Sequence, residues 1–535
     1  MTKKQMSKSS TALILAGIMA SLLLSALDST VVSTAMKNIV DNLGGMQLYS
    51  WPFTTYMLCS TIAILICGGL ADIYGHKLMF MIGIVTFLAG SILCGLSQSM
   101  IQLIAFRGLQ GIGGGIIVSS VFTVVADMFE PADRGKYTGI VTSMYGLASI
   151  IGPLAGGFIT DALGWRWIFF INLPLGILAI VIVAIAMPSF KNVEIKKPVD
   201  YTGIAALVLT LVPMLLAFSM AGNNFAWISV PCIGMFLFSA IMMALFVFLE
   251  KRSSNPMIPL AFFKDRAICV SFLIAFFSQA LMFSTVIYLP YFVQGVIGSS
   301  ATTSGAVITP MMLGLLLSSN ITGQLVSRIG KAKLLSASAF LVMGVGALLL
   351  STMGVGTSYS SAILFMVILG FGVGMSMPIT NVNAQNAAPR DQIGSVTSTV
   401  MFFRNIGSTI SSAVYGVIMT NSLSNGFSGL NMQYLPQEIQ GMLKNTQIIT
   451  NAQTVATIRS QVPKLYLSYF DDLYLQAKAV LANSIHDVFL FCVVIAAIGF
   501  FCSLFLREAP LIKSKKIVER EPVKVVEMMD DLANR

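Results

Sequence analysis

The chain has 535 residues, of which 56% are hydrophobic and only 10% are charged, whereas a water-soluble domain usually carries about 25% charged residues. Apolar runs of about 20 residues recur along the whole sequence, which excludes a string of soluble domains and predicts one polytopic membrane domain. The net charge of +10 does not indicate a nucleic-acid partner, because most Lys and Arg residues lie in alternate loops, as expected of cytoplasmic segments.

The apolar runs predict about fourteen membrane-crossing helices. The first run resembles a signal peptide because it follows Lys3, Lys4 and Lys8, but it is too long for a cleaved segment and contains Asp28, so we expect a retained helix. The expected spans are 11–35, 51–71, 78–97, 100–126, 137–159, 167–188, 201–221, 229–249, 268–293, 303–325, 334–352, 360–384, 394–421 and 486–507.

An internal repeat organises these helices. The residues Gly68, Leu70, Asp72, Gly75 and Lys77 recur as Gly323, Leu325, Ser327, Gly330 and Lys331. The repeat predicts an all-α membrane protein with two six-helix bundles, 1–190 and 267–507, related by an axis along the membrane normal. Two inserted helices with their linkers fill 191–266, and 508–535 is a tail. Both termini are then cytoplasmic.

A polar outer loop at 422–485 interrupts the second bundle before its last helix. Its stretches 436–442 and 454–481 have the character of helical pieces. A loop of this length is usually functional or disordered. It either caps the outer mouth of a cavity or is a flexible insertion, and the sequence favours neither.

The loop GGLADIYGHK at 68–77 is short and charged. Gly68 and Gly75 permit a tight reversal, Asp72 is favoured near the start of the next helix by the helix dipole, and Lys77 supplies inside charge. Taken alone, the loop indicates no more than a good turn.

Together with RGLQG at 107–111 and GPLAGG at 152–157, this loop resembles the motifs of the major facilitator superfamily. The segments LDSTVVSTAM at 27–36, WRWIFFINLP at 165–174 and YLPYFVQGVIG at 288–298, with the two extra helices, resemble the fourteen-helix drug:proton antiporter family. The resemblance covers about 10–507. It implies the major facilitator fold, a gating role for the 68–77 loop, and export by antiport.

Four positions depart from the family pattern. Ile73 and His76 stand where arginines are common, Ser327 replaces an acidic residue in the repeat, and Ala148 replaces a leading glycine. The resemblance therefore does not support the second half of the gating latch.

The run Gly152, Pro153, Gly156 and Gly157 predicts a flexible packing face, because proline removes a backbone hydrogen bond and glycine lets a neighbouring helix approach. An ordinary small-residue helix contact is the alternative.

Asp28 is the carboxylate that lies deep inside an expected span, where an acid costs on the order of 3 kcal/mol. A carboxyl group in such a cavity can titrate when water or a cationic substrate enters. Asp28 is therefore the candidate for proton exchange, substrate-cation contact, or both. The alternative is a static hydrogen bond to Ser25 or Ser29.

Arg107 and Arg404 also lie within expected spans, and each needs a partner because neither can lose its proton. The resemblance implies that Arg107 and Gln110 lie close to Asp28. For Arg404, interior pairing is favoured over snorkelling to the interface, because it lies about ten residues into its span.

Aromatic, amide and methionine side chains predict a largely apolar, adaptable cavity, although any one of them is more often simple packing. The candidates are Tyr56, Tyr145, Gln279, Met282, Tyr288, Tyr291, Asn381, Asn383, Phe402 and Phe403.

Enzymatic chemistry is not indicated. The seven cysteines all fall in apolar spans, which argues against disulfides or a metal site, and the spans show no Cys/His cluster, paired acids or nucleophile arrangement. No GxxxxGK[ST] loop for ATP is present. We expect no cofactor apart from protons as the coupling ion.

The sequence thus predicts a monomeric, proton-coupled antiporter of the cell membrane that exports small lipophilic or cationic organic compounds by alternating access. The alternative is a dedicated exporter of one lipid-like or metabolite substrate, since a dedicated dication site would ordinarily need a second deep acid.

Overall fold

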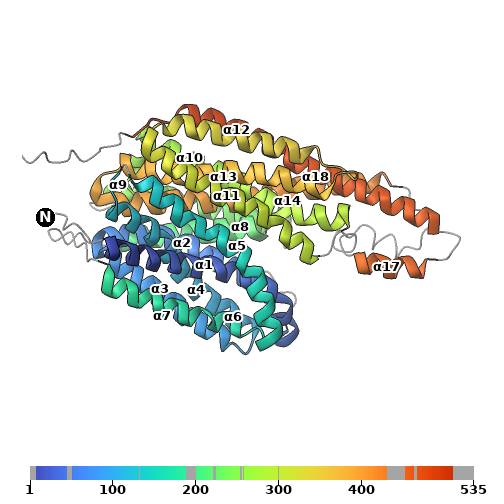
Figure 1. Ribbon diagram of the computed structural model, residues 1–535, viewed down its shortest axis with the longest axis horizontal. Helices are drawn as coiled ribbons and strands as arrows, with labels where there is room; N and C mark the ends of the chain where they lie inside the picture. The colour runs from blue at the N-terminus through green and yellow to red at the C-terminus, as the bar shows by residue number, and fades with distance from the viewer. Residues whose placement is uncertain are drawn as a thin grey trace, which may run out of the picture.

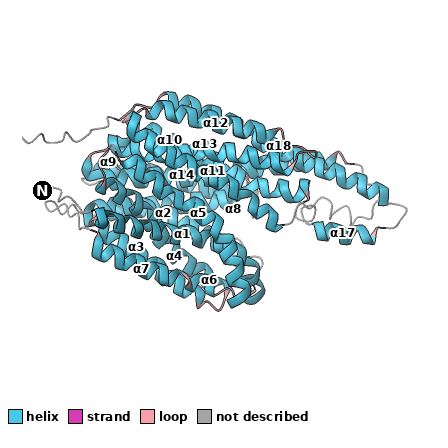
Figure 2. Ribbon diagram, viewed as in Figure 1, coloured by secondary structure: helices cyan, strands magenta, loops and turns pink. Residues whose placement is uncertain are grey.

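The structure is a computed structural model. It describes residues 8–44, 48, 51–131, 133–187, 200–220, 225–253, 256, 258–298, 301–430, 452–462 and 467–509. The extended regular elements within these ranges are all helices (Figure 2).

The first half contains α1 (Lys8–Leu43), α2 (Trp51–Tyr74), α3 (His76–Gly95), α4 (Met100–Met128), α5 (Arg134–Leu163), α6 (Trp167–Phe170) and α7 (Asn172–Ala186). Two helices follow, α8 (Tyr201–Met220) and α9 (Val230–Arg252). The second half contains α10 (Arg266–Phe292), α11 (Ala301–Ile329), α12 (Ala332–Ser351), α13 (Tyr359–Ala387), α14 (Ile393–Ser428), α17 (Ala452–Gln461) and α18 (Leu467–Leu504).

Eleven of the described helical segments are long and apolar enough to cross a membrane, with α6 and α7 counted as one segment. Helices α5, α11 and α14, which have 30, 29 and 36 residues, are long enough but less apolar. They lie between the two halves, where side chains face protein instead of lipid and polar groups can find partners.

The two halves pack their helices in the same way. In the first half α4 lies against α2 and α3, and α1 lies against α5 and α7. In the second half α13 lies against α11 and α12, and α10 lies against α14 and α18. These matched pairings give two six-helix bundles, seen below and above one another in Figure 1.

Two seams join the bundles, α2 with α14 and α5 with α11. Each seam contains one helix from each repeat position, as a twofold relation requires. We call the end with the α2–α3 and α11–α12 turns the motif end, and the opposite end the far end. The ribbons of the two bundles lie together at the motif end, where the N-terminus also lies, and diverge toward the far end (Figure 1).

The inserted helices α8 and α9 pack on each other, and α8 also contacts both α2 and α14. Ala206, Leu207 and Leu211 of α8 are buried in one apolar cluster with Ile62 of α2 and Phe402 of α14. The insertion therefore covers the α2–α14 seam and leaves the α5–α11 seam uncovered by it.

The last helix differs from the expectation. It begins at Leu467 and not near residue 486, and α14 extends to Ser428. Both helices run on past the expected membrane region, because amphipathic segments there pack on one another, with Gly426 of α14 against Val480 of α18. The expected piece 454–481 is thus divided between α17 and α18, whereas 436–442 lies outside the described residues.

Candidate functional site

A polar network fills the middle of the first bundle. Asp28 of α1 is 1% exposed and Arg107 of α4 is also 1% exposed. Arg107 Nη1 donates to Asp28 Oδ2 at 2.5 Å, and Gln110 Nε2 donates to Asp28 Oδ1 at 2.7 Å. The structure therefore brings together the three residues that the resemblance implied would meet.

Glycines let α4 come close enough to make this network. A Cβ at Gly90 of α3 would stand 2.6 Å from the Gln110 backbone, and a Cβ at Gly111 would stand 2.5 Å from the Tyr56 carbonyl oxygen of α2. Larger residues at these crossings would push α4 away from its neighbours. The glycine spacing thus sets the depth at which Gln110 and Arg107 reach Asp28.

Asn172, the first residue of α7, is a member of the network that sequence reasoning did not single out. Its side chain is 3% exposed, and Nδ2 donates to Asp28 Oδ1 at 3.2 Å and to Ser91 Oγ at 3.0 Å. The expected span 167–188 is broken at Ile171, between α6 and α7, and the break aims Asn172 inward. A lone asparagine in an apolar segment was the available signal.

The network orders its donors and acceptors around one carboxylate. Arg107 Nη1 also donates to Gln110 Oε1 at 2.8 Å, and the guanidinium lies 4.3 Å from the centroid of the Tyr56 ring. Among the described residues, Arg107 Nε has no hydrogen-bond partner. Breaking such a buried pair by removing one partner costs about 3–5 kcal/mol, so any event that neutralises Asp28 must strongly perturb the contacts between α1 and α4.

Asp72 joins the bundles at the motif end. Its Oδ1 accepts from the Gly394 backbone N at 2.9 Å, and its Oδ2 accepts from the backbone N and Oγ of Ser395 at 2.9 and 2.7 Å. These are first-turn groups of α14, so a carboxylate of one bundle caps a helix of the other. Gly68 makes room, since a Cβ there would stand 2.8 Å from the Gly394 carbonyl oxygen.

The repeat position makes a neutral version of the same cap. Ser327 Oγ accepts from the Lys136 backbone N, in the first turn of α5, at 3.2 Å. The two turns also agree in backbone, with φ of +94° at Gly75 and +69° at Gly330, values that favour glycine. A hydroxyl contact between the bundles thus lies where the second half of the expected latch would be, for which the resemblance gave no support.

His76 lies between two carboxylates beside the Asp72 cap. Its Nε2 is 3.5 Å from Asp72 Oδ1 and its Nδ1 is 3.3 Å from Asp127 Oδ2 of α4. Lys77 Nζ donates to the Ala184 and Met187 carbonyl oxygens at 2.8 and 2.7 Å, at the end of α7. His76 and Lys77 therefore tie α3 to its own bundle, and Asp72 ties that bundle to the other.

The glycines of the 152–157 run differ in their surroundings. A Cβ at Gly152 would clash with Thr30 Oγ1 of α1, whereas a Cβ at Gly157 would meet nothing within 4 Å. Close approach of α1 thus explains Gly152 and not Gly157. Gly156 is buried in α5, and Pro153 lies outside the side chains that the structure describes.

Arg404 is separate from the Asp28 network. Its side chain is 6% exposed, and it donates to Thr380 Oγ1 at 3.0 Å and to Met401 Sδ at 3.3 Å. Among the described residues it has no carboxylate partner, and Nε is unbonded. Interior placement, not snorkelling, is what the structure shows, but the ion pair expected for it is not formed.

The ten cavity candidates scatter. Tyr56 belongs to the Asp28 network, and Tyr145 and Asn381 lie in helices that face the other bundle. Asn383 donates to the Ala267 and Arg507 carbonyl oxygens at the motif end. Gln279 and Met282 contact each other, since Gln279 Nε2 donates to Met282 Sδ. Tyr288 lies in the core of the second bundle, and Tyr291 is exposed. Phe402 lies in the apolar cluster that α8 covers, and Phe403 stacks on Phe272.

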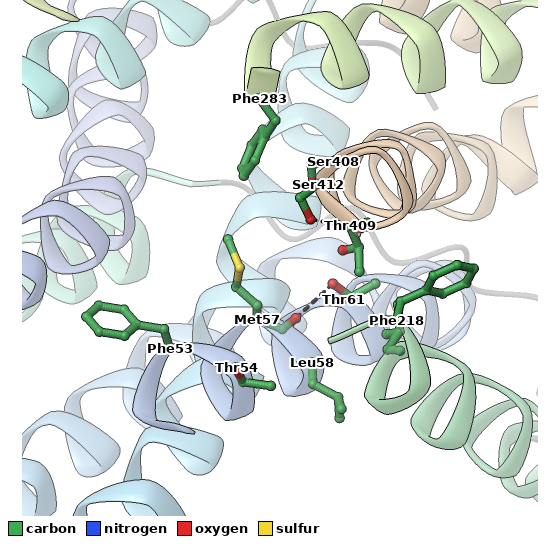
Figure 3. A pocket seen from close by; sticks show the side chains of 11 residues that line it. Phe53, Thr54, Met57, Leu58, Thr61, Phe218, Phe283, Ser408, Thr409 and Ser412 are labelled. Carbon is green, nitrogen blue, oxygen red and sulfur yellow. Dashed lines mark hydrogen bonds between the residues drawn. The ribbon is translucent and has the colours of Figure 1, made fainter. Parts of the chain in front are cut away.

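A pocket lies between α2, α8, α10 and α14, with a cavity volume of about 160 Å³ (Figure 3). None of the ten candidates lines it. Sequence reasoning missed its residues because Phe, Thr, Ser and Leu are common in membrane helices and carry no signal one by one.

Within the described residues no group of His, Cys, Asp and Glu could hold a metal ion, and the seven cysteines are free.

Known proteins with similar sequences and folds agree with this architecture. The family model of the Major Facilitator Superfamily matches residues 18–412. The chain is 35% identical to multidrug transporter protein MdtP of Bacillus subtilis, with 98% of each chain covered. It is 34% identical to multidrug resistance protein 3 of the same organism, with 94% of this chain and 96% of that one covered.

More distant matches extend the range. Efflux pump dotC of Dothistroma septosporum is 28% identical and the match covers 95% of this chain and 85% of that one. Among solved structures, the proton:xylose symporter XylE superposes with a TM-score of 0.58 at 12% identity, covering 90% of this chain and 95% of that one. The human organic anion transporter MFSD10 gives a TM-score of 0.58 at 15% identity, with 91% and 99% covered. The chain is a multi-pass membrane transporter, not an enzyme, and it belongs to the major facilitator superfamily.

Proposed function

We propose that this chain is a proton-coupled antiporter that exports small lipophilic or cationic organic compounds. The observation that carries the proposal is the buried Asp28 carboxylate, which accepts hydrogen bonds from Arg107, Gln110 and Asn172. A lone acid held by donors from α4 and α7 is a group whose charge decides how three helices of one bundle pack.

Protonation of Asp28 supplies the coupling step. A proton that arrives from the far end cancels the charge that attracts Arg107. The protonated carboxyl group is itself a hydrogen-bond donor, and it then faces the donors of Arg107, Gln110 and Asn172. The same change weakens the hold of the carboxylate on a bound cation. The contacts of α1 with α4 and α7 then favour a different packing, and the bundles rock so that the proton leaves at the motif end.

The Asp72 and Ser327 caps support the gating part of this cycle. Both caps cross from one bundle to the other at the motif end, and each must break when that end opens. We assign the motif end to the cytoplasm, which places both termini inside and agrees with the basic loops there. The names of the relatives, multidrug transporter and efflux pump, support export of more than one compound.

The test is transport of a fluorescent organic cation into everted membrane vesicles with and without an uncoupler. Asp28→Asn keeps the size of the side chain and removes its titration, so uptake should fall to the level of the uncoupled wild type. The matched control is Asp161→Asn, which changes an exposed carboxyl at the far end of α5 and should leave uptake unchanged.

Retention of full gradient-driven uptake by normally inserted Asp28→Asn protein would show that the coupling role is wrongly assigned. Competition between chemically unrelated compounds is expected for multidrug export. If one lipid-like or metabolite compound alone were transported, the chain would be a dedicated exporter.

A further inference from the structure

The pocket of Figure 3 has walls from both bundles and from the insertion. The lining residues are Phe53, Thr54, Met57, Leu58, Thr61, Leu215, Phe218, Phe283, Ser408, Thr409 and Ser412. None of them is ionisable, so the pocket offers no counter-charge to an ion. A charged group that enters it meets no fixed charge of opposite sign.

The apolar part of the lining suits an aromatic or alkyl body. Phe53, Phe218 and Phe283 come from α2, α8 and α10, and Met57 adds an unbranched side chain that adapts to shape. A cavity of about 150 Å³ lined by apolar side chains holds benzene, and this pocket has about 160 Å³. One ring with a short substituent therefore fits.

The hydroxyl groups of the pocket can act as hydrogen-bond acceptors for an occupant. Ser408 and Thr409 both donate to the Asn405 carbonyl oxygen, at 2.7 and 3.0 Å, and Ser412 donates to the Thr409 carbonyl oxygen at 2.9 Å. Thr61 donates to the Met57 carbonyl oxygen at 2.8 Å. The hydrogens of these four hydroxyls are used within their own helices, so Ser408, Thr409 and Ser412 present lone pairs to an occupant, whereas Thr61 Oγ1 also accepts from Asn405 Nδ2 at 3.5 Å.

Helix α8 forms one wall of the pocket and is held in place by packing contacts on both sides of it. The Phe218 ring packs edge-on against Phe236 of α9 with centroids 5.0 Å apart, and against Trp227 at 6.4 Å. Toward the motif end, Leu207 and Leu211 of α8 are buried against both bundles. The insertion is thus fixed on either side of the wall it contributes.

We propose that this pocket is a binding site for uncharged lipophilic molecules that carry a hydrogen-bond donor, and that the inserted helix α8 is part of the site. The site would admit alcohols, phenols and amides with a one-ring body. A lipid acyl chain matches the apolar wall but has no donor for the hydroxyls of α14. The inference extends the proposed function by naming a neutral class of compound, and binding there does not require proton coupling.

The experiment compares 4-butylphenol with its methyl ether, 4-butylanisole, by isothermal titration calorimetry on the full chain in lipid nanodiscs, with empty nanodiscs subtracted. Wild-type protein should bind the phenol about fivefold to tenfold more tightly, the worth of one hydrogen bond. The triple variant Ser408→Ala, Thr409→Val, Ser412→Ala should bind the two probes equally.

Phe218→Ala should weaken both probes by about tenfold or more, because a ring wall is lost. The control is Leu209→Ala on the exposed face of the same helix, where the side chain is 48% exposed, and it should bind as the wild type does. Phe218→Leu retains apolar bulk and guards against misfolding, and should lose less affinity than Phe218→Ala.

Equal binding of the phenol and the ether by wild-type protein would overturn the donor preference, and wild-type affinity in Phe218→Ala would overturn the role of α8. Probe binding is measured with Asp28 unaltered and without a proton gradient across the bilayer. Full gradient-driven transport by Asp28→Asn would therefore overturn the coupling role and leave this proposal standing, and a failure of probe binding would leave the coupling proposal standing.

Discussion

The two bundles share their helix pairings and differ in what they bury. Helices α4 and α13 are both 29 residues long, and aligning their first residues places Met366 and Leu369 where α4 has Arg107 and Gln110. Met366 and Leu369 are fully buried in a large apolar cluster, whereas Arg107 and Gln110 hold Asp28.

The contrast shows that the repeated fold does not need an ion pair at its centre. An apolar interior supports the same packing in the second bundle without the desolvation cost of buried charge. The buried charge in the first bundle therefore has a role other than stabilising the fold. Substitutions that make this interior apolar, like that of the second bundle, should separate that role from stability.

The largest effect is expected from removing one member of the buried pair. Arg107→Met leaves Asp28 buried without its cation and should lower the free energy of unfolding by about 3–5 kcal/mol. Asp28→Leu together with Arg107→Met makes this interior resemble that of the second bundle and should recover most of the loss. Thermal unfolding of the purified proteins measures both.

If the double variant were as unstable as Arg107→Met, the comparison between the bundles would fail. The double variant should also transport nothing in response to a proton gradient, because the titrating group is gone.

The charged Asp72 cap should stabilise the N-terminus of α14 by about 1 kcal/mol more than the neutral Ser327 cap stabilises that of α5, because a carboxylate is favoured by the helix dipole. Asp72→Ser copies the neutral cap and should raise amide hydrogen exchange in the first turn of α14 about fivefold. Ser327→Asp copies the charged cap and should slow exchange in the first turn of α5. Mass spectrometry follows both segments, and in each variant the unaltered seam is the internal control.

Unchanged exchange at α14 in Asp72→Ser would mean that the three hydrogen bonds to Asp72 do not hold that seam.

A smaller effect is expected from Asn172→Ala, which removes the longest hydrogen bond to Asp28. The carboxylate is then held less firmly by α7, so gradient-driven uptake should fall by about twofold to fivefold, less than in Asp28→Asn. Ser29→Ala is the control, since Ser29 Oγ lies next to Asp28 on α1 but donates to the Ala26 carbonyl oxygen of its own helix. Unchanged uptake in Asn172→Ala would argue against a role for this hydrogen bond in coupling.

The smallest effect should be shared by the two bundles. Gly157 of α5 and Gly416 of α14 both have nothing within 4 Å of an added Cβ. Alanine at either position should be neutral or stabilise the helix by up to about 1 kcal/mol, seen as an unchanged or slightly raised Tm. A large drop in transport without a drop in Tm for Gly157→Ala alone would indicate a hinge at that residue.

Much of the fold was predictable from residue order, because lipid demands apolar runs of set length and the turn glycines mark the repeat. The α2–α3 and α11–α12 turns, Gly75 and Gly330 lie as the repeat predicted. The start of α18 was predicted less well, because the added turns from Leu467 are amphipathic and pack on protein beyond the expected membrane region.

The candidate site was predictable where chemistry is rare. A carboxylate and an arginine inside spans stand out, so Asp28 and Arg107 could be named. Asn172 and the pocket residues could not, since a single amide or hydroxyl fits many surroundings. The contacts of Phe402 and Asn383 could not be predicted either, because the apolar residues of α13 and α14 show little helical periodicity, and the sequence therefore does not tell which helix face meets a neighbouring helix.

By itself, the sequence determined that the chain crosses a membrane many times and that it repeats. It also determined that Asp28, Arg107 and Arg404 lie deep inside spans, because apolar length and the rarity of charge are properties of single segments. The tertiary structure alone decided that Arg404 has no carboxylate partner among the described residues, that Asn172 joins Asp28, that Asp72 caps a helix of the other bundle, and that α8 forms one wall of a pocket. Those outcomes depend on which faces of distant helices come together, and that is set by the packing of all of them at once.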